Sequence, residues 1–140
     1  MASKPIRKER MKIILDSNAL FVPIQFKIDI HAELATLLNR NFDLIVLSAV
    51  KREIEILAER SSPQTRKNAK YALKLAEKLK NVKVDERANV TTDDVIVDTA
   101  KRWNAPVFTN DKQLRKKLRD ISVPVIYVRQ KSRLEIDGMM

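Results

Sequence analysis

Short apolar runs alternate along the chain with longer stretches in which apolar residues recur every three or four positions. The short runs, such as KIILD at 12–16 and DLIVL at 43–47, are typical of strands buried on both faces. The longer stretches are typical of amphipathic helices. The pattern predicts strands at 12–16, 43–47, 82–84, 105–111 and 123–128, helices at 29–39, 48 to about 61, 64–80, 91–103 and 111–121, and a brief turn at 18–21.

This alternation of strands and helices indicates parallel pairing through right-handed crossovers. We therefore expect an α/β fold, a three-layer α/β/α sandwich, formed by a single domain at residues 11–130. Residues 1–10, MASKPIRKER, are interpreted as a basic N-terminal tail and residues 131–140 as a C-terminal tail.

The helix that Ser48 is predicted to cap carries a glutamate on its apolar face. At about 100° per residue, Glu53 falls in the same arc as Val50 and Ile54, while most other charged residues of the segment lie on the opposite side. Because an unpaired buried charge is costly, Glu53 must have a partner. That partner is either a cation held by several acids or Arg60 on the same face.

Further acids stand at the ends of predicted strands and at the start of a helix. Asp16 ends the first strand, and Asp111 closely follows another. Because the carboxyl ends of parallel strands meet at one edge of a sheet, we expect both beside Glu53. Asp94 and Asp98 are four residues apart on one helical face. They would reach this edge only if their helix crosses over the other face of the sheet.

Each acid also has an ordinary structural interpretation. Asp16 and Asp111 could cap the segments that follow them, and Asp94 could complete a capping box with Thr91. Converging carboxylates would, however, repel one another unless a cation sits between them. Oxygen ligands without histidine or thiolate favour Mg²⁺ or Mn²⁺, which bind phosphates, so the acids suggest phosphodiester hydrolysis.

The chain carries 28 Lys and Arg against 18 Asp and Glu, a formal charge of +10. This excess favours polyanionic partners, above all nucleic acid. The alternative is a charged surface that keeps a heat-adapted protein soluble. The candidate RNA-binding cations lie on two basic helices and are Lys67, Lys70, Lys112, Arg115, Lys116 and Arg119.

Three scarce residue types exclude other chemistries. The chain has no cysteine, which removes disulfides and thiol nucleophiles and fits a reducing compartment. Gly138 is the single glycine and His31 the single histidine, so a glycine-rich phosphate loop and a histidine triad are excluded. The apolar runs are far shorter than the roughly 20 residues of a membrane span, so we expect a cytoplasmic protein without a membrane partner.

Four segments, in their order along the chain, resemble the motifs of PIN-domain nucleases. IILDSNAL resembles the opening strand and first acid, and LSAVKREIEIL the second, with Ser48 before the helix and Glu53 in the acidic position. TTDDVIVDTAKRWNAPVFTNDKQL resembles the third and fourth, ending in Thr109, Asn110 and Asp111. The resemblance covers about residues 11–130.

The resemblance implies a five-stranded parallel sheet and Mg²⁺- or Mn²⁺-dependent cleavage of RNA. The metal site and catalytic acids that it implies are Asp16, Glu53, Asp94 and Asp111, with Asp98 as an additional metal ligand. Supporting positions are Asn18, Ser48, Thr109 and Asn110. Asp93 leaves a one-residue ambiguity, which we settle for Asp94 on the apolar spacing that follows it.

Residues 91–136 look most like the branch of endonucleases that process small-subunit ribosomal RNA, with their archaeal relatives. We therefore expect an endoribonuclease acting on structured RNA such as precursor rRNA. A VapC-type toxin ribonuclease and a non-catalytic RNA-binding module of ribosome assembly are the alternatives. A phosphoryl-transfer domain with Asp16 as nucleophile is disfavoured, because haloacid-type phosphatases usually need an aspartate where this chain has Asn18. A homodimer and an antitoxin partner both stay open.

Overall fold

The computed structural model describes residues 10–85 and 89–140. The predicted N-terminal tail lies outside these ranges except for Arg10. The elements, in chain order, are β1 (Met11–Leu15), α1 (Ser17–Phe26), α2 (Ile30–Leu38), β2 (Phe42–Leu47), α3 (Ser48–Arg60), α4 (Pro63–Glu77), β3 (Lys80–Val82), α5 (Thr92–Trp103), β4 (Val107–Phe108), α6 (Lys112–Asp120), β5 (Val125–Arg129) and β6 (Arg133–Asp137).

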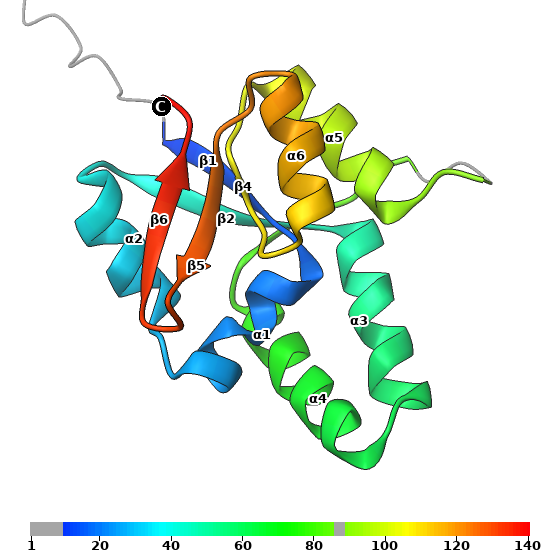
Figure 1. Ribbon diagram of the computed structural model, residues 1–140. Coiled ribbons are helices and arrows are strands. Elements are labelled where there is room, and N and C mark those ends of the chain that lie inside the picture. Colours follow the sequence, from blue (N-terminus) through cyan, green and yellow to red (C-terminus); the bar gives the residue numbers. More distant parts are fainter. Residues whose placement is uncertain (1–9, 86–88) are drawn as a thin grey trace, which may run out of the picture.

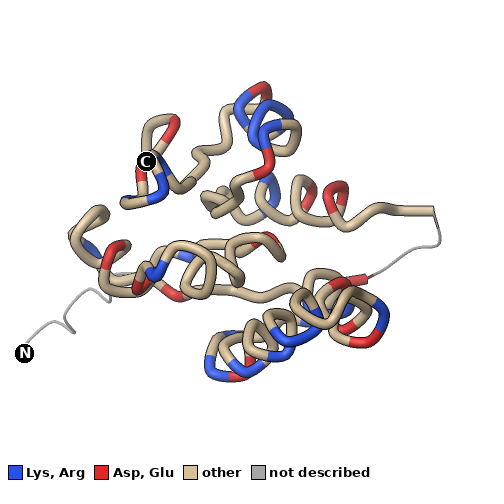
Figure 2. Tube along the Cα trace, turned by 60° about the horizontal axis from the view of Figure 1, so that its bottom comes forward, with Lys and Arg blue, Asp and Glu red and all other residues tan. Residues whose placement is uncertain are grey.

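The predicted α/β sandwich is confirmed. The sheet has the strand order β3-β2-β1-β4-β5-β6, with α1, α3 and α4 on one side and α5 and α6 on the other (Figures 1 and 2). The central strand β1 pairs in parallel with β2 and β4. Its residues Ile13, Ile14 and Leu15 are fully buried, which explains why the run reads as continuously apolar.

The chain changes direction across the sheet beside β1. From β1 it moves outward through β2 to β3, and then returns over α5 to β4 and β5 on the other side. In open α/β sheets, ligands bind at the carboxyl ends of the strands where the order reverses in this way. Here that point lies between the ends of β1 and β4, directly before Asp16 and Thr109.

The sheet differs from the prediction at its C-terminal edge. Residues 133–137, predicted as part of a tail, form β6, which pairs antiparallel with β5 and makes a sixth strand. Leu134 is buried in the core, so the burial of this side chain and the backbone pairing hold the segment in place. Strand β3 also begins earlier than predicted, at Lys80.

Helix α1 replaces the brief turn predicted at 18–21. It has ten residues and contains Pro23, which cannot donate a backbone hydrogen bond. Ala19, Leu20 and Val22 are fully buried, so this face of the helix packs into the core despite the proline. The sequence pattern failed because nearly all of the segment is apolar and shows no helical periodicity.

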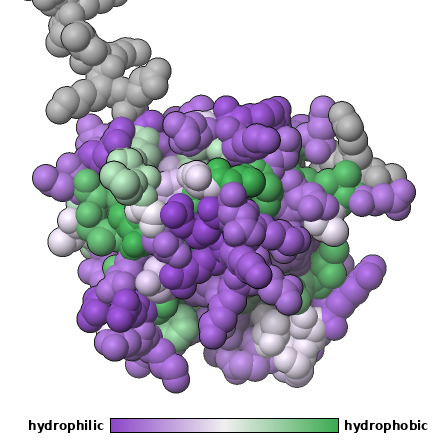
Figure 3. All heavy atoms as spheres, turned by 45° about the horizontal axis from the view of Figure 1, so that its top comes forward, coloured by the Kyte–Doolittle hydropathy of each residue, from purple (hydrophilic) through white to green (hydrophobic). Residues whose placement is uncertain are grey.

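Polar side chains cover most of the face drawn in Figure 3, and hydrophobic side chains appear on it only in separate patches. Among the described residues, none of the helices is both long enough and apolar enough to cross a bilayer.

Candidate active site

Asp16 is the most buried acid of the site, with 4% of its surface exposed at the end of β1. Its Oδ1 accepts a hydrogen bond from the backbone N–H of Ser17 at 2.8 Å, at the start of α1. Its Oδ2 accepts from the Thr109 hydroxyl at 2.7 Å and from the Asn18 amide at 2.9 Å. The carboxylate therefore bridges the ends of β1 and β4 and is held in one orientation.

Burial raises the pKa of Asp16, and the nearby carboxylates of Asp93 and Glu53 raise it further. The hydrogen bonds from Thr109 and from the backbone of Ser17 oppose this increase. The balance shows that hydrogen bonding does not fully compensate the buried negative charge. No described cation forms an ion pair with Asp16.

Glu53 lies on the second turn of α3 and is partly buried. Its Oε1 accepts a hydrogen bond of 2.6 Å from the hydroxyl of Ser17, which directly follows Asp16. Within the described part of the chain, Glu53 forms no ion pair with Arg60, so that alternative is wrong. The misplaced glutamate of the sequence thus points to the end of β1.

Asp111 follows β4 and is the N-cap of α6. Its Oδ1 accepts hydrogen bonds from the backbone N–H groups of Gln113 at 2.8 Å and Leu114 at 3.1 Å. The Thr109 hydroxyl that donates to Asp16 also accepts from the backbone N–H of Asp111, at 3.1 Å. One threonine therefore links two of the predicted acids, and Asp111 combines a capping role with a place at the site.

Asp93 interacts electrostatically with the carboxylates of Asp16, Glu53 and Asp111. Burial raises the pKa of Asp93, and the carboxylates of Asp111, Glu53 and Asp94 raise it further, whereas Lys117 lowers it. Asp93 is also among the groups that raise the pKa of Asp16. Asp93 is therefore electrostatically coupled to all three other site acids.

The structure places the side chains of Asp94 and Asp98 on another part of the surface, and their role as metal ligands stays a prediction. Asp94 follows the Thr91 N-cap, whose hydroxyl accepts a hydrogen bond from its backbone N–H at 3.1 Å. Both side chains are exposed and line a separate hollow beside the segment that follows β3. Asp98 forms an ion pair with Arg102 at 3.1 Å, one turn further along α5.

Asn18 and Asn110 connect the site to the rest of the sheet. The Asn18 Oδ1 accepts from the backbone N–H of Asn110 at 2.9 Å, while its amide donates to Asp16. The Asn110 Oδ1 accepts from the backbone N–H of Val128 on β5 at 2.8 Å. These asparagines fix the segment between β4 and Asp111, as expected of supporting residues.

Ser48 does not act as the predicted N-cap. It is the first residue of α3, and the N-cap position is Leu47, which makes no capping hydrogen bond with its side chain. Instead the Ser48 hydroxyl accepts from the backbone N–H of Val84 at 3.0 Å and donates to its carbonyl at 3.4 Å. Ser48 therefore ties the segment after β3 to the start of α3, and within residues 10–85 and 89–140 its hydroxyl forms no hydrogen bond with the acids of the site.

The four clustered acids offer oxygen donors of the kind that Mg²⁺ and Mn²⁺ prefer. Within residues 10–85 and 89–140, Asp111 Oδ2 and Glu53 Oε2 accept no hydrogen bond. Over the same residues, no group of three or more acidic or histidine side chains is arranged so that it could hold a metal ion. The carboxylate oxygens of these residues therefore suit such an ion chemically, although their side chains are not arranged as a preformed binding site.

The predicted RNA-binding cations have different surroundings. Lys67 and Lys70 are exposed on α4, and Lys112 and Lys116 on α6. The Arg115 guanidinium lies over the Tyr127 ring at 3.8 Å and pairs with Asp137 at 3.0 Å. Arg119 pairs with the same carboxylate, which holds both arginines against β6 instead of leaving them free for RNA.

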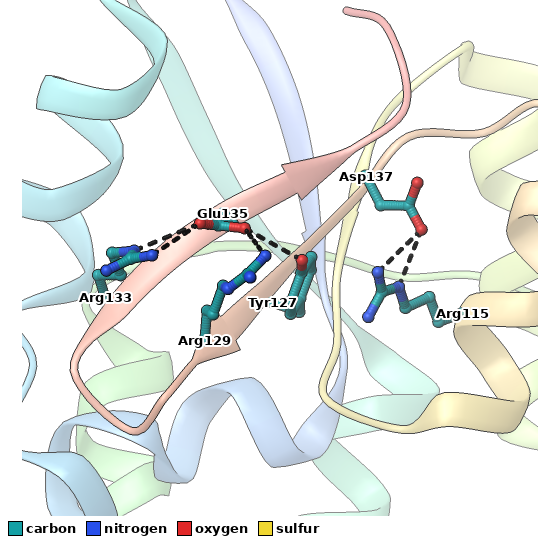
Figure 4. A network of polar contacts seen from close by, with 6 residues as sticks. All are labelled: Arg115, Tyr127, Arg129, Arg133, Glu135 and Asp137. Atoms are coloured by element: carbon teal, nitrogen blue, oxygen red, sulfur yellow. Dashed lines mark hydrogen bonds and ion pairs between the residues drawn. The ribbon is translucent and has the colours of Figure 1, made fainter.

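Asp137 belongs to a polar network on β5 and β6 (Figure 4). Glu135 accepts hydrogen bonds from Arg129 at 2.9 Å, from Arg133 and from the Tyr127 hydroxyl. Charged side chains of β6 thus order the basic side chains of β5 and α6 next to the site. This role was missed because the segment had been predicted to be a tail.

Sequence reasoning also missed Ser17, and it selected Asp94 where the electrostatics of the structure favour Asp93. A hydroxyl residue directly after a strand-ending acid is a weak signal for Ser17. A helical wheel centred on the buried residues of α5, rather than the apolar spacing alone, would have indicated Asp93.

Comparisons with known proteins identify the family of the chain. The family described as PIN like domain matches residues 13–131. Ribonuclease VapC4 of Methanocaldococcus jannaschii is 36% identical over 130 residues, which are 92% of this chain and 98% of that protein. Ribonuclease VapC9 of Archaeoglobus fulgidus is 26% identical over 124 residues, 89% of this chain and 87% of that protein.

Solved structures show the same fold. The PIN domain endonuclease Utp24 superposes with a TM-score of 0.76 at 23% identity and covers 92% of each chain. A domain of a functionally unknown protein from Methanocaldococcus jannaschii superposes with a TM-score of 0.64 at 14% identity, covering 93% of this chain and 99% of that one.

Proposed function

Since the chain belongs to the PIN-like domain family, we propose that it is a metal-dependent endoribonuclease whose acids are Asp16, Glu53, Asp93 and Asp111. The observation that carries this proposal is the buried Asp16, whose pKa is raised by burial and by two further carboxylates. Such an uncompensated cluster destabilises the fold, and this cost is explained if the acids bind a cation and act in catalysis.

The donor chemistry of the cluster supports magnesium or manganese. Asp16, Glu53, Asp93 and Asp111 would hold the ion. When bound, it would supply a water of lowered pKa and would polarise the scissile phosphate. The names of the two curated relatives, both called ribonucleases, support RNA as the substrate.

Neighbouring polar residues orient the carboxylates of Asp16 and Glu53. Thr109 and Asn18 donate to one oxygen of Asp16 and keep its other lone pairs directed into the site. Ser17 donates to Glu53 and fixes it beside Asp16. Preorganised groups of this kind lower the reorganisation that the transition state requires.

Exposed lysines near the site would bind the RNA backbone. Lys112 lies beside Thr109 and Asn110 in a hollow of about 270 Å³ that also borders Tyr127 and Arg129. Lys116 follows one turn later on α6. Arg115 and Arg119 contribute positive charge to the same surface, although Asp137 holds them in place.

The test is cleavage of an end-labelled RNA by the full chain in EDTA, Mg²⁺ or Mn²⁺. The wild-type protein is expected to cleave only with a divalent ion, and Asp16→Asn to be slower by at least about 100-fold. Equal rates for the two proteins would remove Asp16 from the mechanism. Tight RNA binding without any cleavage would instead favour a non-catalytic RNA-binding module.

For the biological substrate we propose precursor ribosomal RNA, supported by the resemblance of residues 91–136 to the rRNA-processing branch. Crosslinking the protein to RNA in cells and sequencing the bound RNA tests this. Recovery of small-subunit rRNA precursors is the expected result, and their absence from the bound RNA would contradict it.

A toxin ribonuclease of VapC type is the second candidate, favoured by the names of the two curated relatives. In that case expression of the wild-type chain, but not of Asp16→Asn, would arrest growth, and an antitoxin partner would relieve the arrest. Both candidates would act on RNA in the cytoplasm.

A further inference from the structure

The outward side of α4 carries a basic stripe that the candidate active site does not use. Its residues recur at helical spacing and border one open hollow of about 470 Å³. We call them the α4 basic face: Pro63, Arg66, Lys67, Lys70, Tyr71 and Lys74.

The packing of α4 does not require these residues. Ala69, Ala72 and Ala76 are fully buried on the opposite side of the helix, which contacts α3 and α1. Tyr71, in contrast, is 66% exposed and is the one aromatic residue among the exposed large hydrophobic side chains of the described chain. Its ring contributes little to the core.

The cations of this face are not neutralised. Over the described ranges, none of the four basic side chains of the stripe forms an ion pair with an acid. This contrasts with Arg115 and Arg119 on α6, which share Asp137. Lys and Arg positions recur along α4 in Figure 2, and the one acid of the helix is Glu77, at its last residue.

A flat ring surrounded by unpaired cations matches the chemistry of single-stranded nucleic acid. Bases stack on exposed aromatic rings while cations bind the phosphates on either side. A duplex keeps its bases stacked inside, so it offers nothing to Tyr71. A protein partner fits poorly, because lysine is depleted in the cores of protein interfaces, and three of the six residues here are lysines.

We propose that the α4 basic face binds a single-stranded RNA segment that flanks the cleavage site, with Tyr71 stacking on a base and the cations on the phosphates. This rests on the proposed function for the identity of the nucleic acid. Helix α4 packs against α1, which begins beside Asp16, and against α3, which carries Glu53. The stripe therefore lies on a helix that packs against two elements of the candidate site.

The experiment measures binding in EDTA, separately from cleavage, with the full-length chain and a fluorescein-labelled 20-nucleotide RNA without secondary structure. Tyr71→Ala is expected to weaken binding about 5- to 100-fold, whereas Tyr71→Phe, which retains the ring, stays within about twofold of the wild type. Lys70→Gln is expected to reduce the slope of log affinity against log salt concentration by about 0.7.

Lys101→Gln, on the exposed side of α5, is the matched control and should leave the salt slope unchanged. A 20-base-pair RNA duplex should bind Tyr71→Ala and wild type equally. If Tyr71→Ala bound the single-stranded RNA with the affinity of the wild type, the inference would be overturned. If Tyr71→Ala lost affinity for RNA while the wild-type protein cleaved no RNA, the α4 basic face would be supported as an RNA-binding surface. The same result would overturn the proposed nuclease function.

Discussion

Asp93 and Asp94 are neighbours in the chain but face different surroundings. Asp93 is partly buried and interacts electrostatically with Asp16, Glu53 and Asp111, whereas Asp94 is exposed in another hollow. The residue pair therefore provides a matched test of the site, because both changes remove one carboxylate from the same helix turn.

We expect Asp93→Asn to reduce the rate of RNA cleavage by about 100- to 10,000-fold, the range typical of a lost catalytic acid or base. Asp94→Asn should stay within about threefold of the wild type. Rates of metal-dependent cleavage, measured with a saturating and a limiting concentration of Mn²⁺, give the comparison. The reverse order of the two variants would restore Asp94 to the site.

The raised pKa of Asp16 makes stability depend on pH. In the folded protein Asp16 keeps its proton above 3.8, the value of an ordinary aspartate, so the folded state binds more protons than the unfolded state in this range. The free energy of unfolding therefore falls as pH rises through the folded-state pKa.

Asp16→Asn removes this contribution. In EDTA, the free energy of unfolding of the variant relative to that of the wild type should increase from pH 3.5 upward and level off above the folded-state pKa. The hydrogen bonds altered by asparagine add an offset that does not change with pH. Urea denaturation at a series of pH values measures the difference, and a constant difference would contradict the assignment.

At the level of elements, β6 stabilises the sheet edge and orders the basic surface beside the site. It buries Leu134, covers the outer edge of β5 and supplies Glu135 and Asp137 to the arginines of Figure 4. Without β6, the edge of β5 would present unpaired backbone groups, which promote association between chains.

Deletion of residues 133–140 is therefore expected to lower the free energy of unfolding by at least about 2 kcal/mol, because the burial of one leucine side chain alone contributes this much. The melting temperature should fall by more than about 5 °C. Deletion of Met139 and Met140 only, which are 94% and 47% exposed, is the control and should have little effect. Equal melting temperatures for both truncations would show that β6 does not contribute to stability.

For the whole molecule, the fold brings four acids from distant segments close enough to interact electrostatically. The four come after β1, from α3, from the start of α5 and after β4, so they meet only when both sides of the sheet are assembled. Their mutual repulsion opposes folding, and a bound divalent ion would offset it.

Mn²⁺ is therefore expected to stabilise the folded protein. At a concentration of 100 times the dissociation constant, linkage gives about 2.7 kcal/mol, or about 5–10 °C in melting temperature. Thermal denaturation with Mn²⁺, compared with NaCl at equal ionic strength, measures the shift. Asp94→Asn should keep the shift and Asp93→Asn should lose most of it; equal shifts in both would place the ion outside this cluster.

The sequence by itself determined most of the elements, apart from α1 and β6, and pointed to acids near the carboxyl ends of the strands. The continuous apolar runs fixed the parallel strands, because a strand covered on both faces cannot expose polar residues. Asp16 and Asp111 could be located because they follow such strands within three residues, and Glu53 because a carboxylate on an apolar helical face needs a partner. These are local properties, readable from a few neighbouring residues.

The tertiary structure decided what depends on contacts between distant segments. On the wheel of α5, with Val95 at zero, Thr99 and Ala100 lie at about 40° and 140°, Asp93 at about 160° and Asp94 at about 260°. The wheel therefore separates the two acids, and the packed helix shows which elements the Asp93 side faces. The hydrogen bond from Ser17 to Glu53 joins residues of two separate elements that no local pattern connects. Helical and strand periodicity report which side of an element is buried, whereas partners across the fold are set by how the elements pack together.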